Sequence, residues 1–239
     1  MTDRAAIVTG ASRGIGRVIA ETLAAEGYSL TISARRPVAL DETVTSLRAA
    51  GHDVQSVTAN IAEEDAVREI VDRHRHRFGR LDVLVNNAGV GIGAQAGEHL
   101  TKHIDLQLGV NLRAIILFYR EALDLLRQAG AEHGHALVIN MASIAGKSPQ
   151  PWLSVYSAAK AGAVAYTRAM NRELVRDGVK SVAFCPGFVD TDMSDFIKGE
   201  IAVDDMLRTQ DIAAAVRLVL QVSNPCVIPE IMFARHDDV

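Results

Sequence analysis

The chain has 239 residues, of which 49% are apolar, and its 25 lysines and arginines stand against 29 aspartates and glutamates. A net charge of -4 gives no general attraction to nucleic acid, so we expect no nucleic-acid partner. The most apolar helical stretch, residues 112–119, contains Arg113 and is far shorter than the roughly 20 residues that a membrane-spanning helix needs. The first residues lack the layout of a signal peptide. These features predict a cytoplasmic protein without a membrane span.

Strand-like and helix-like segments alternate along the whole chain. Apolar runs and helical periodicity predict strand 5–9, helix 14–26, strand 28–34, helix 40–47, strand 54–59, helix 63–78 and strand 81–85. The same signals then predict helix 100–129, strand 136–141, helix 153–176, strand 179–184, helix 212–219 and strand 226–233. The strands are apolar on both faces, which is typical of a parallel sheet covered by helices on both sides.

The chain shows no linker, repeat or low-complexity tract. We therefore expect one domain over residues 1–239, an α/β, doubly wound parallel sheet of about seven strands of the Rossmann type. One irregular segment, at about residues 190–206, follows a late strand and combines glycine, aromatic and charged residues. This pattern is typical of a surface loop over a binding site, so we interpret it as a substrate flap.

Two helical stretches, residues 112–118 and 155–165, are apolar or small on nearly every side. A helix that is apolar all round must be covered all round, and a sheet covers only one side. A crowded core would explain the pattern, but a subunit interface explains it better. We therefore expect a homodimer or a homotetramer.

A glycine-rich segment, Thr9-Gly-Ala-Ser-Arg-Gly-Ile-Gly16, joins the first predicted strand to the first predicted helix. Glycines let the backbone turn tightly and approach a diphosphate, and the start of a helix offers free N–H groups. The spacing differs from that of the common GxGxxG fingerprint, but it serves the same physical purpose. The segment predicts a nucleotide site.

Polar residues typical of catalysis follow the later strands. Tyr156 and Lys160 lie four residues apart on a predicted helix and share one of its faces. Ser143 follows the fifth strand, Asn86-Asn-Ala-Gly89 follows the fourth, and Asn111 lies in the helix after that. A tyrosine has an ordinary pKa of about 10, and a neighbouring cation lowers that pKa toward working pH. We therefore interpret Tyr156 as a general acid/base assisted by Lys160.

These motifs, in this order, resemble those of the classical short-chain dehydrogenase/reductase family, and the resemblance covers essentially the whole chain. It implies a hydride transfer between a nicotinamide cofactor and a carbonyl or alcohol, with Asn111, Ser143, Tyr156 and Lys160 as catalytic residues. Lys160 would also hold the nicotinamide ribose, Ser143 would bind the substrate oxygen, and Asn111 would hold a water. The residues and the resemblance together predict a set of cofactor-binding positions: Gly10, Ser12, Arg13, Gly14, Ile15, Gly16, Arg35, Arg36, Asn60, Ile61, Asn87, Ala88, Gly89, Tyr156, Lys160, Pro186, Gly187, Val189 and Thr191. Asn60 departs from the family, which usually has an aspartate there.

The end of the second strand predicts which cofactor is preferred. An acidic residue there would bind the adenosine ribose and disfavour a 2′-phosphate, but this chain has Ala34 followed by Arg35 and Arg36. Arg13 lies in the glycine loop, and two guanidinium groups aimed at one point would suit a 2′-phosphate. We therefore expect NADP, as NADPH in reduction, to be preferred over NAD.

The remaining residues set the limits of this interpretation. The residues expected around the substrate are mostly apolar and suit a neutral, partly hydrophobic carbonyl or alcohol: 90–95, Ile144, Gln150, Trp152, Phe188, Met193 and Phe196. No histidine pair has enough further ligands nearby to predict a metal site. One alternative is a nucleotide-binding regulator or scaffold without turnover, although it would not need all four catalytic residues. Another is an epimerase or dehydratase, for which no additional acid/base group is clearly placed.

Overall fold

The computed structural model describes residues 4–238, which contain one seven-stranded sheet in which every neighbouring pair of strands is parallel. The strand order is β3-β2-β1-β4-β5-β6-β7, so the order reverses direction between β1 and β4. The predicted Rossmann-type sheet is confirmed. The strands are β1 (Ala5–Thr9), β2 (Ser29–Ala34), β3 (Val54–Thr58), β4 (Val83–Asn86), β5 (Ala136–Met141), β6 (Val179–Pro186) and β7 (Glu230–Phe233).

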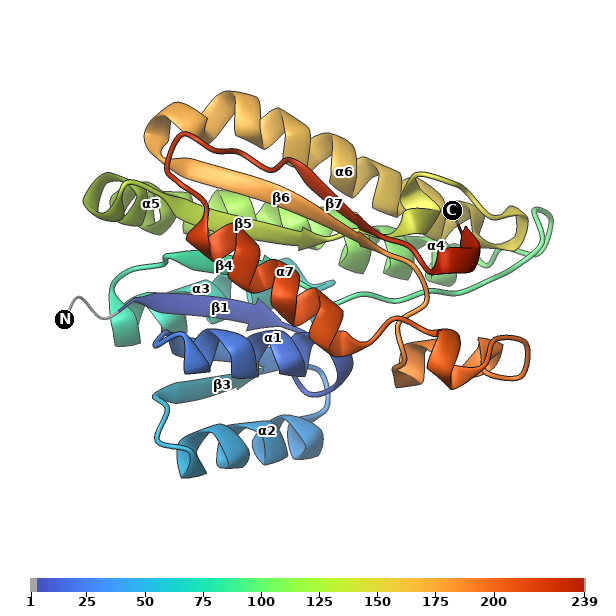
Figure 1. Ribbon diagram of the computed structural model, residues 1–239, viewed down its shortest axis with the longest axis horizontal. Coiled ribbons are helices and arrows are strands. Elements are labelled where there is room, and N and C mark those ends of the chain that lie inside the picture. The colour runs from blue at the N-terminus through green and yellow to red at the C-terminus, as the bar shows by residue number, and fades with distance from the viewer. Residues whose placement is uncertain (1–3, 239) are drawn as a thin grey trace.

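Helices cover both faces of the sheet (Figure 1). One core packs the sheet against α1 (Gly14–Ala25), α2 (Pro37–Ala49) and α7 (Thr209–Gln221). The other packs it against α3 (Glu64–Phe78), α4 (Thr101–Leu108), α5 (Ala114–His133) and α6 (Ser154–Leu174). Over residues 4–238, no helix combines the length and the hydrophobicity of a membrane-spanning segment.

The predicted long helix over residues 100–129 is not continuous. α4 and α5 are separated by a π-helical turn, Gly109–Arg113, which has Asn111 at its centre. A single π turn inside a helix leaves the chain helical on both sides, so a pattern that predicts helix does not reveal it. The helix also continues to His133, where Gly134 ends it in the left-handed conformation.

The segments after β6 differ in detail from the prediction. The expected strand over residues 226–233 is regular only from Glu230, since Pro229 lacks the N–H group that a strand would use for pairing. The predicted flap at residues 190–206 holds two short 3₁₀ helices, Asp192–Ile197 and Val203–Asp205. It lies beyond the carboxyl end of the sheet, in orange in Figure 1.

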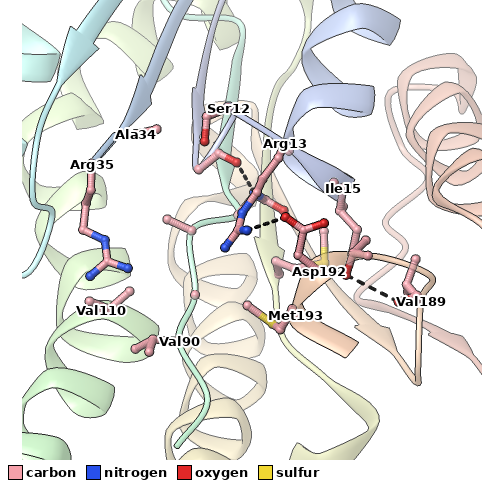
Figure 2. Close-up of a pocket in the computed structure, with 18 of the residues that line it drawn as sticks. Ser12, Arg13, Ile15, Ala34, Arg35, Val90, Val110, Val189, Asp192 and Met193 are labelled. Atoms are coloured by element: carbon pink, nitrogen blue, oxygen red, sulfur yellow. Dashed lines mark hydrogen bonds and ion pairs between the residues drawn. The ribbon is translucent and has the colours of Figure 1, made fainter. Parts of the chain in front are cut away.

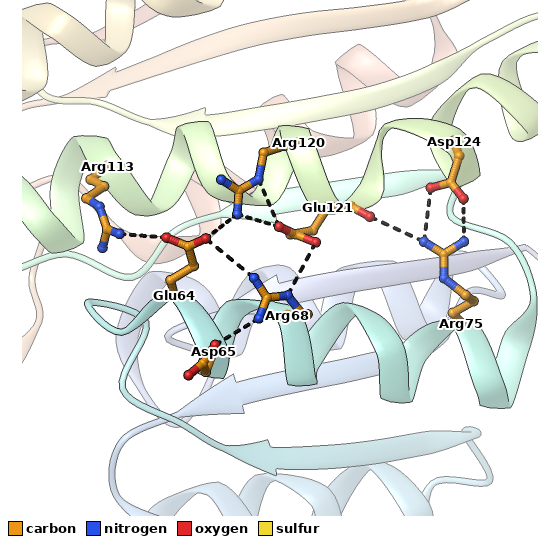
Figure 3. A network of polar contacts seen from close by, with 8 residues as sticks. All are labelled: Glu64, Asp65, Arg68, Arg75, Arg113, Arg120, Glu121 and Asp124. Carbon is orange, nitrogen blue, oxygen red and sulfur yellow. Dashed lines mark hydrogen bonds and ion pairs between the residues drawn. The ribbon is translucent and has the colours of Figure 1, made fainter.

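An exposed network of ion pairs joins α3 to α5 (Figure 3). Glu64 accepts from Arg113 at 2.8 Å and from Arg120 at 2.6 Å, and Arg120 beside it holds the pKa of the Glu64 carboxyl below its ordinary value. Further along the same pair of helices, Arg75 makes two hydrogen bonds to the carboxylate of Asp124. Exposed pairs of this kind contribute little individually, but together they fix the register of the two helices.

Candidate functional site

A pocket opens at the carboxyl ends of the central strands, where the strand order reverses between the paired strands β1 and β4. Parallel α/β sheets commonly bind ligands at such a reversal of strand order. The glycine loop and the segment after β2 line one part of the pocket, and Ser143, Tyr156 and Lys160 line another. All the predicted cofactor-binding positions lie on its wall. Of the four predicted catalytic residues, Ser143, Tyr156 and Lys160 line the pocket and Asn111 does not.

The glycine loop approaches its neighbours too closely for side chains. A Cβ atom on Gly16 would lie 2.3 Å from the carbonyl oxygen of Gly10 and 2.4 Å from the amide nitrogen of Asn87. Gly10 has a φ of +68°, and a Cβ there would lie 2.8 Å from the Cα of Ala88. Glycine is therefore required at both positions. The resulting backbone leaves the start of α1 open to the pocket.

Asn87 ties the end of β4 to this loop. Its side-chain nitrogen donates to the carbonyl oxygens of Thr9 at 2.9 Å and Gly10 at 3.3 Å. The hydroxyl of Thr9 in turn accepts from the backbone N–H groups of Asn87 and Ala88, each at 3.0 Å. Thr9 belongs to the glycine motif, but its pairing with the end of β4 depends on tertiary contacts that the sequence pattern does not show.

Ser143, Tyr156 and Lys160 all line the pocket. The ammonium of Lys160 is buried, lies 5.6 Å from the centre of the Tyr156 ring and donates to the carbonyl oxygen of Met141 at 2.6 Å. The Ser143 hydroxyl accepts from the N–H of Ala145 at 3.1 Å and donates to the carbonyl oxygen of Pro186 at 3.3 Å. The predicted cluster is therefore formed by segments that follow β5 and start α6.

The protonation of this cluster differs from the expectation. Burial raises the pKa of the Tyr156 hydroxyl, and hydrogen bonding with Ser143 opposes that shift only in part. Burial also lowers the pKa of Lys160 to about 8. Lys160 therefore does not draw the pKa of Tyr156 down in this structure, because its ammonium is directed at the Met141 carbonyl and is itself disfavoured by desolvation.

Two buried amide side chains on successive turns hold the segment after β4. Asn111 accepts from the N–H of Val90 at 3.0 Å and donates to its carbonyl oxygen at 2.7 Å. Gln107, four residues earlier and fully buried, accepts from the N–H of Ile92 at 3.0 Å. Asn111 is thus engaged with the backbone rather than exposed to the pocket. Gln107 was missed by the sequence analysis, although its spacing of four from Asn111 was a usable signal.

The two arginines expected to converge on a 2′-phosphate do not converge here. The guanidinium of Arg13 pairs with the carboxylate of Asp192, on the flap, whereas Arg35 lies on the other side of the pocket (Figure 2). The expected pair is therefore split, because an opposite charge from a segment about 180 residues away captures Arg13. Arg35 is exposed and makes no ion pair with any residue from 4 to 238. Asp192 lines the pocket and was also missed.

Of the residues expected around the substrate, five are placed by the pocket and by ring contacts, whereas Ile144, Gln150 and residues 91–95 do not line the pocket. Val90 and Met193 line the pocket itself. Trp152, Phe188 and Phe196 instead form an aromatic cluster just outside it, with ring centres 5.6 Å apart for Trp152 and Phe196. Within residues 4–238 no three histidine, cysteine, aspartate or glutamate side chains are grouped as a metal site would require.

The site and the sheet together match known proteins. Residues 4–201 match the model of the family described as short chain dehydrogenase. The 3-oxoacyl-[acyl-carrier-protein] reductase of Synechocystis sp. is 34% identical to the chain over 201 residues. The aligned region covers 84% of this chain and 80% of that protein.

Solved structures agree over almost the full length. An alcohol dehydrogenase from the archaeon Thermococcus sibiricus, complexed with 5-hydroxy-NADP, superposes with a TM-score of 0.88 at 29% identity, over 98% of this chain and 97% of its own. A 3-ketoacyl-(acyl-carrier-protein) reductase from Brucella melitensis, complexed with NADH, gives a TM-score of 0.87 at 26% identity, over 98% and 97%. The chain therefore belongs to the short-chain dehydrogenase/reductase family of oxidoreductases.

Proposed function

We propose that this protein is an NADP-dependent oxidoreductase that interconverts a carbonyl and an alcohol, with Tyr156 as the general acid/base. The observation that carries the proposal is that Ser143, Tyr156 and Lys160 line the same pocket as a glycine loop at a helix start. A pocket lined in this way suits a dinucleotide that reaches from the loop to the reacting carbon.

The glycine loop and the segment after β2 both fit a dinucleotide. The loop at Gly10 and Gly16 leaves no room for side chains but leaves the N-terminus of α1 facing the pocket, which favours a diphosphate. The segment after β2 offers Arg35 and no acid at Ala34, which favours a 2′-phosphate. Structural neighbours were solved with an NADP derivative and with NADH, so the preference rests on these two residues.

The chain's own residues would then supply the proton and the positioning. When bound, the reduced nicotinamide would supply the hydride to the carbonyl carbon. The Ser143 hydroxyl would donate a hydrogen bond to the carbonyl oxygen and hold it beside Tyr156. The raised pKa of Tyr156 keeps its phenol protonated near neutral pH, so that it can give its proton to that oxygen. Lys160, whose ammonium lies 5.6 Å from the centre of the Tyr156 ring, would hold the nicotinamide ribose beside the phenol.

A panel of neutral ketones, aldehydes and alcohols tests this function. The purified protein is mixed with each compound and with NADPH, NADP, NADH or NAD, and cofactor absorbance is followed. We expect the protein to consume NADPH when a ketone is present and to consume NADH more slowly. A protein that binds NADPH in a direct titration but consumes none with any compound would instead be the non-catalytic nucleotide binder.

A further inference from the structure

Three aromatic side chains form a wall beside the catalytic cluster, which we call the aromatic wall: Phe188, Trp152 and Phe196. The rings of Trp152 and Phe196 meet edge to face with centres 5.6 Å apart, and those of Phe196 and Phe188 lie 6.2 Å apart. Trp152 comes from the turn before α6, Phe188 from the segment after β6 and Phe196 from the flap. The wall therefore joins three segments that are distant in sequence.

The loop after β4 places the aromatic wall next to Tyr156. A Cβ atom on Gly91 would lie 3.6 Å from the Tyr156 ring, and one on Gly93 would lie 2.5 Å from the Trp152 ring. The backbone N–H of Ala94 also donates to the carbonyl oxygen of Trp152 at 3.0 Å. The same stretch of backbone thus touches both rings two residues apart. Gln107 holds this stretch through Ile92, so its position is fixed from behind.

The aromatic wall is partly exposed to solvent. Trp152 is 36% exposed and Phe196 is 59% exposed. Met193, on the same 3₁₀ turn as Phe196, is 52% exposed and reaches the pocket that Tyr156 lines. An apolar surface left open beside a reacting group is a surface that a ligand can cover. Flat aromatic faces in particular favour flat or ring-shaped apolar partners.

The cations on the segments that adjoin the wall are already engaged. Arg235 lies 5.9 Å from the centre of the Phe188 ring and makes two hydrogen bonds to Asp238. Lys198, on the flap, pairs with Asp190 at 2.9 Å and Asp195 at 2.8 Å. A phosphate or carboxylate on the substrate would have to compete with these carboxylates, so neither cation offers an anionic substrate an unpaired partner at this wall.

We propose that the substrate is a neutral, ring-bearing ketone, or its alcohol, that lies against Trp152 and Phe196 while its oxygen reaches Tyr156. A thioester carried on a phosphate-bearing arm would be a poor substrate, in contrast to what the names of the carrier-protein relatives describe. The substrate class rests on the proposed function, but the binding surface does not, and the two can be tested apart.

Fluorescence tests the binding surface without turnover. Trp152 is the only tryptophan in the chain, so its emission reports directly on the wall. Protein loaded with NADP, which cannot reduce a ketone, is titrated with β-tetralone, with ethyl acetoacetate and with acetoacetyl-CoA. We expect β-tetralone to change the emission saturably and to bind about tenfold more tightly than either of the others. No saturable change with β-tetralone, or tighter binding of acetoacetyl-CoA, would overturn the proposal.

Variants localise the effect. Phe196→Ala should weaken β-tetralone binding about tenfold, whereas Val203→Ala, an exposed residue on the other 3₁₀ turn of the flap, should change it less than about twofold. In turnover with NADPH, Trp152→Ala should raise KM for β-tetralone about tenfold and Trp152→Phe should restore most of the loss. Equal effects of Phe196→Ala and Val203→Ala would contradict a direct contact.

The two proposals fail in different ways. If β-tetralone binds at Trp152 but NADPH is never consumed, the proposed reaction is wrong and the binding surface stands. If acetoacetyl-CoA is reduced and β-tetralone is neither bound nor reduced, the reaction stands and the substrate class is wrong.

Discussion

Arg35 and Arg13 carry the cofactor preference unequally. Arg35 is exposed at the pocket and makes no ion pair within residues 4–238, whereas Arg13 is held by Asp192. A 2′-phosphate can therefore approach Arg35 at once, but it must compete with a carboxylate for Arg13. An exposed ion pair of this kind contributes about 0.2–1 kcal/mol, so the competition is weak but measurable.

We predict that Arg35→Ala weakens NADPH binding about tenfold and NADH binding less than twofold, because one charge-assisted contact to the phosphate is lost. Titration of both cofactors into each protein measures the ratio. Ala34→Asp should also reduce the preference for NADPH over NADH, because the new carboxylate would repel the 2′-phosphate. Arg17→Ala, outside the pocket, is the matched control and should leave both affinities unchanged. Equal losses for both cofactors in Arg35→Ala would show that Arg35 does not contact the phosphate.

Asp192→Asn should tighten NADPH binding by up to about fivefold, since it frees Arg13 while preserving shape. Asp195→Asn removes a charge from the same turn without touching Arg13 and serves as its control. If Asp192→Asn weakens NADPH binding instead, Asp192 supports the cofactor rather than competing with it.

Residue types were easier to predict from the sequence than their contacts. Gly10, Gly16, Tyr156 and Lys160 follow from local spacing, because the loop and one helical face fix them. The direction of Arg13 does not, since Asp192 lies far along the chain. The pKa of Tyr156 was also expected to fall, and burial, which no local pattern encodes, raises it instead.

At the scale of elements, α3 carries a buried histidine that makes stability depend on pH. His74 is fully buried, its Nε2 lies 2.8 Å from the carbonyl oxygen of Arg80, and its Nδ1 lies 2.7 Å from the hydroxyl of Thr31. The nitrogen that faces the carbonyl carries a hydrogen. The Thr31 hydroxyl accepts from Gln55 at 2.8 Å, so its own hydrogen is free to donate to the other nitrogen of a neutral ring. Burial lowers the pKa of His74 to about 4 from its ordinary 6.5.

We predict that the free energy of unfolding decreases as the pH falls from about 6.5 to about 4, by up to about 3 kcal/mol from His74 alone. In that window the unfolded chain binds a proton that the folded chain does not, so acid favours unfolding. Urea unfolding at several pH values measures the slope. His74→Gln should flatten it, whereas His76→Gln, an exposed histidine on the same helix, should not. A slope that is the same in all three proteins would exclude His74 as its source.

Periodicity in the sequence predicts whether a segment is helical better than it predicts local changes within the helix. The helix over residues 100–129 was predicted from its apolar repeat, which does not reveal the π turn at Gly109–Arg113, where Asn111 hydrogen-bonds to Val90. The contact depends on the loop after β4, which the helix meets only in the folded chain. The parallel sheet covered by helices on both faces, in contrast, follows from the alternation of helices and strands and was predicted.

At the scale of the whole molecule, packing within the chain explains only part of the apolar character of residues 112–118 and 155–165. A Cβ atom on Gly162 would lie 2.9 Å from Leu112, so α6 and the π turn are in close contact. Leu108 and Ile116, 39% and 41% exposed, remain open to solvent on the same helical unit. We still propose that copies of this chain cover this surface in a dimer or tetramer.

We predict that the protein sediments as a dimer or tetramer at micromolar concentration, and that Ile116→Arg shifts it toward the 25.7 kDa monomer. Val38→Arg introduces the same charge at a more exposed apolar residue on α2 and should leave assembly unchanged. A wild-type protein that sediments as a monomer would refute the interface.

The central claim is that Tyr156 transfers the proton that completes ketone reduction, and Tyr156→Phe tests it most directly. The measurement is NADPH consumption with a neutral ketone, made together with a direct titration of NADPH into both proteins. Because only the hydroxyl is removed, we predict that turnover falls at least about a hundredfold while NADPH affinity changes less than about twofold. Turnover above about a tenth of wild type, with NADPH still bound, would contradict the assignment of Tyr156 as the acid.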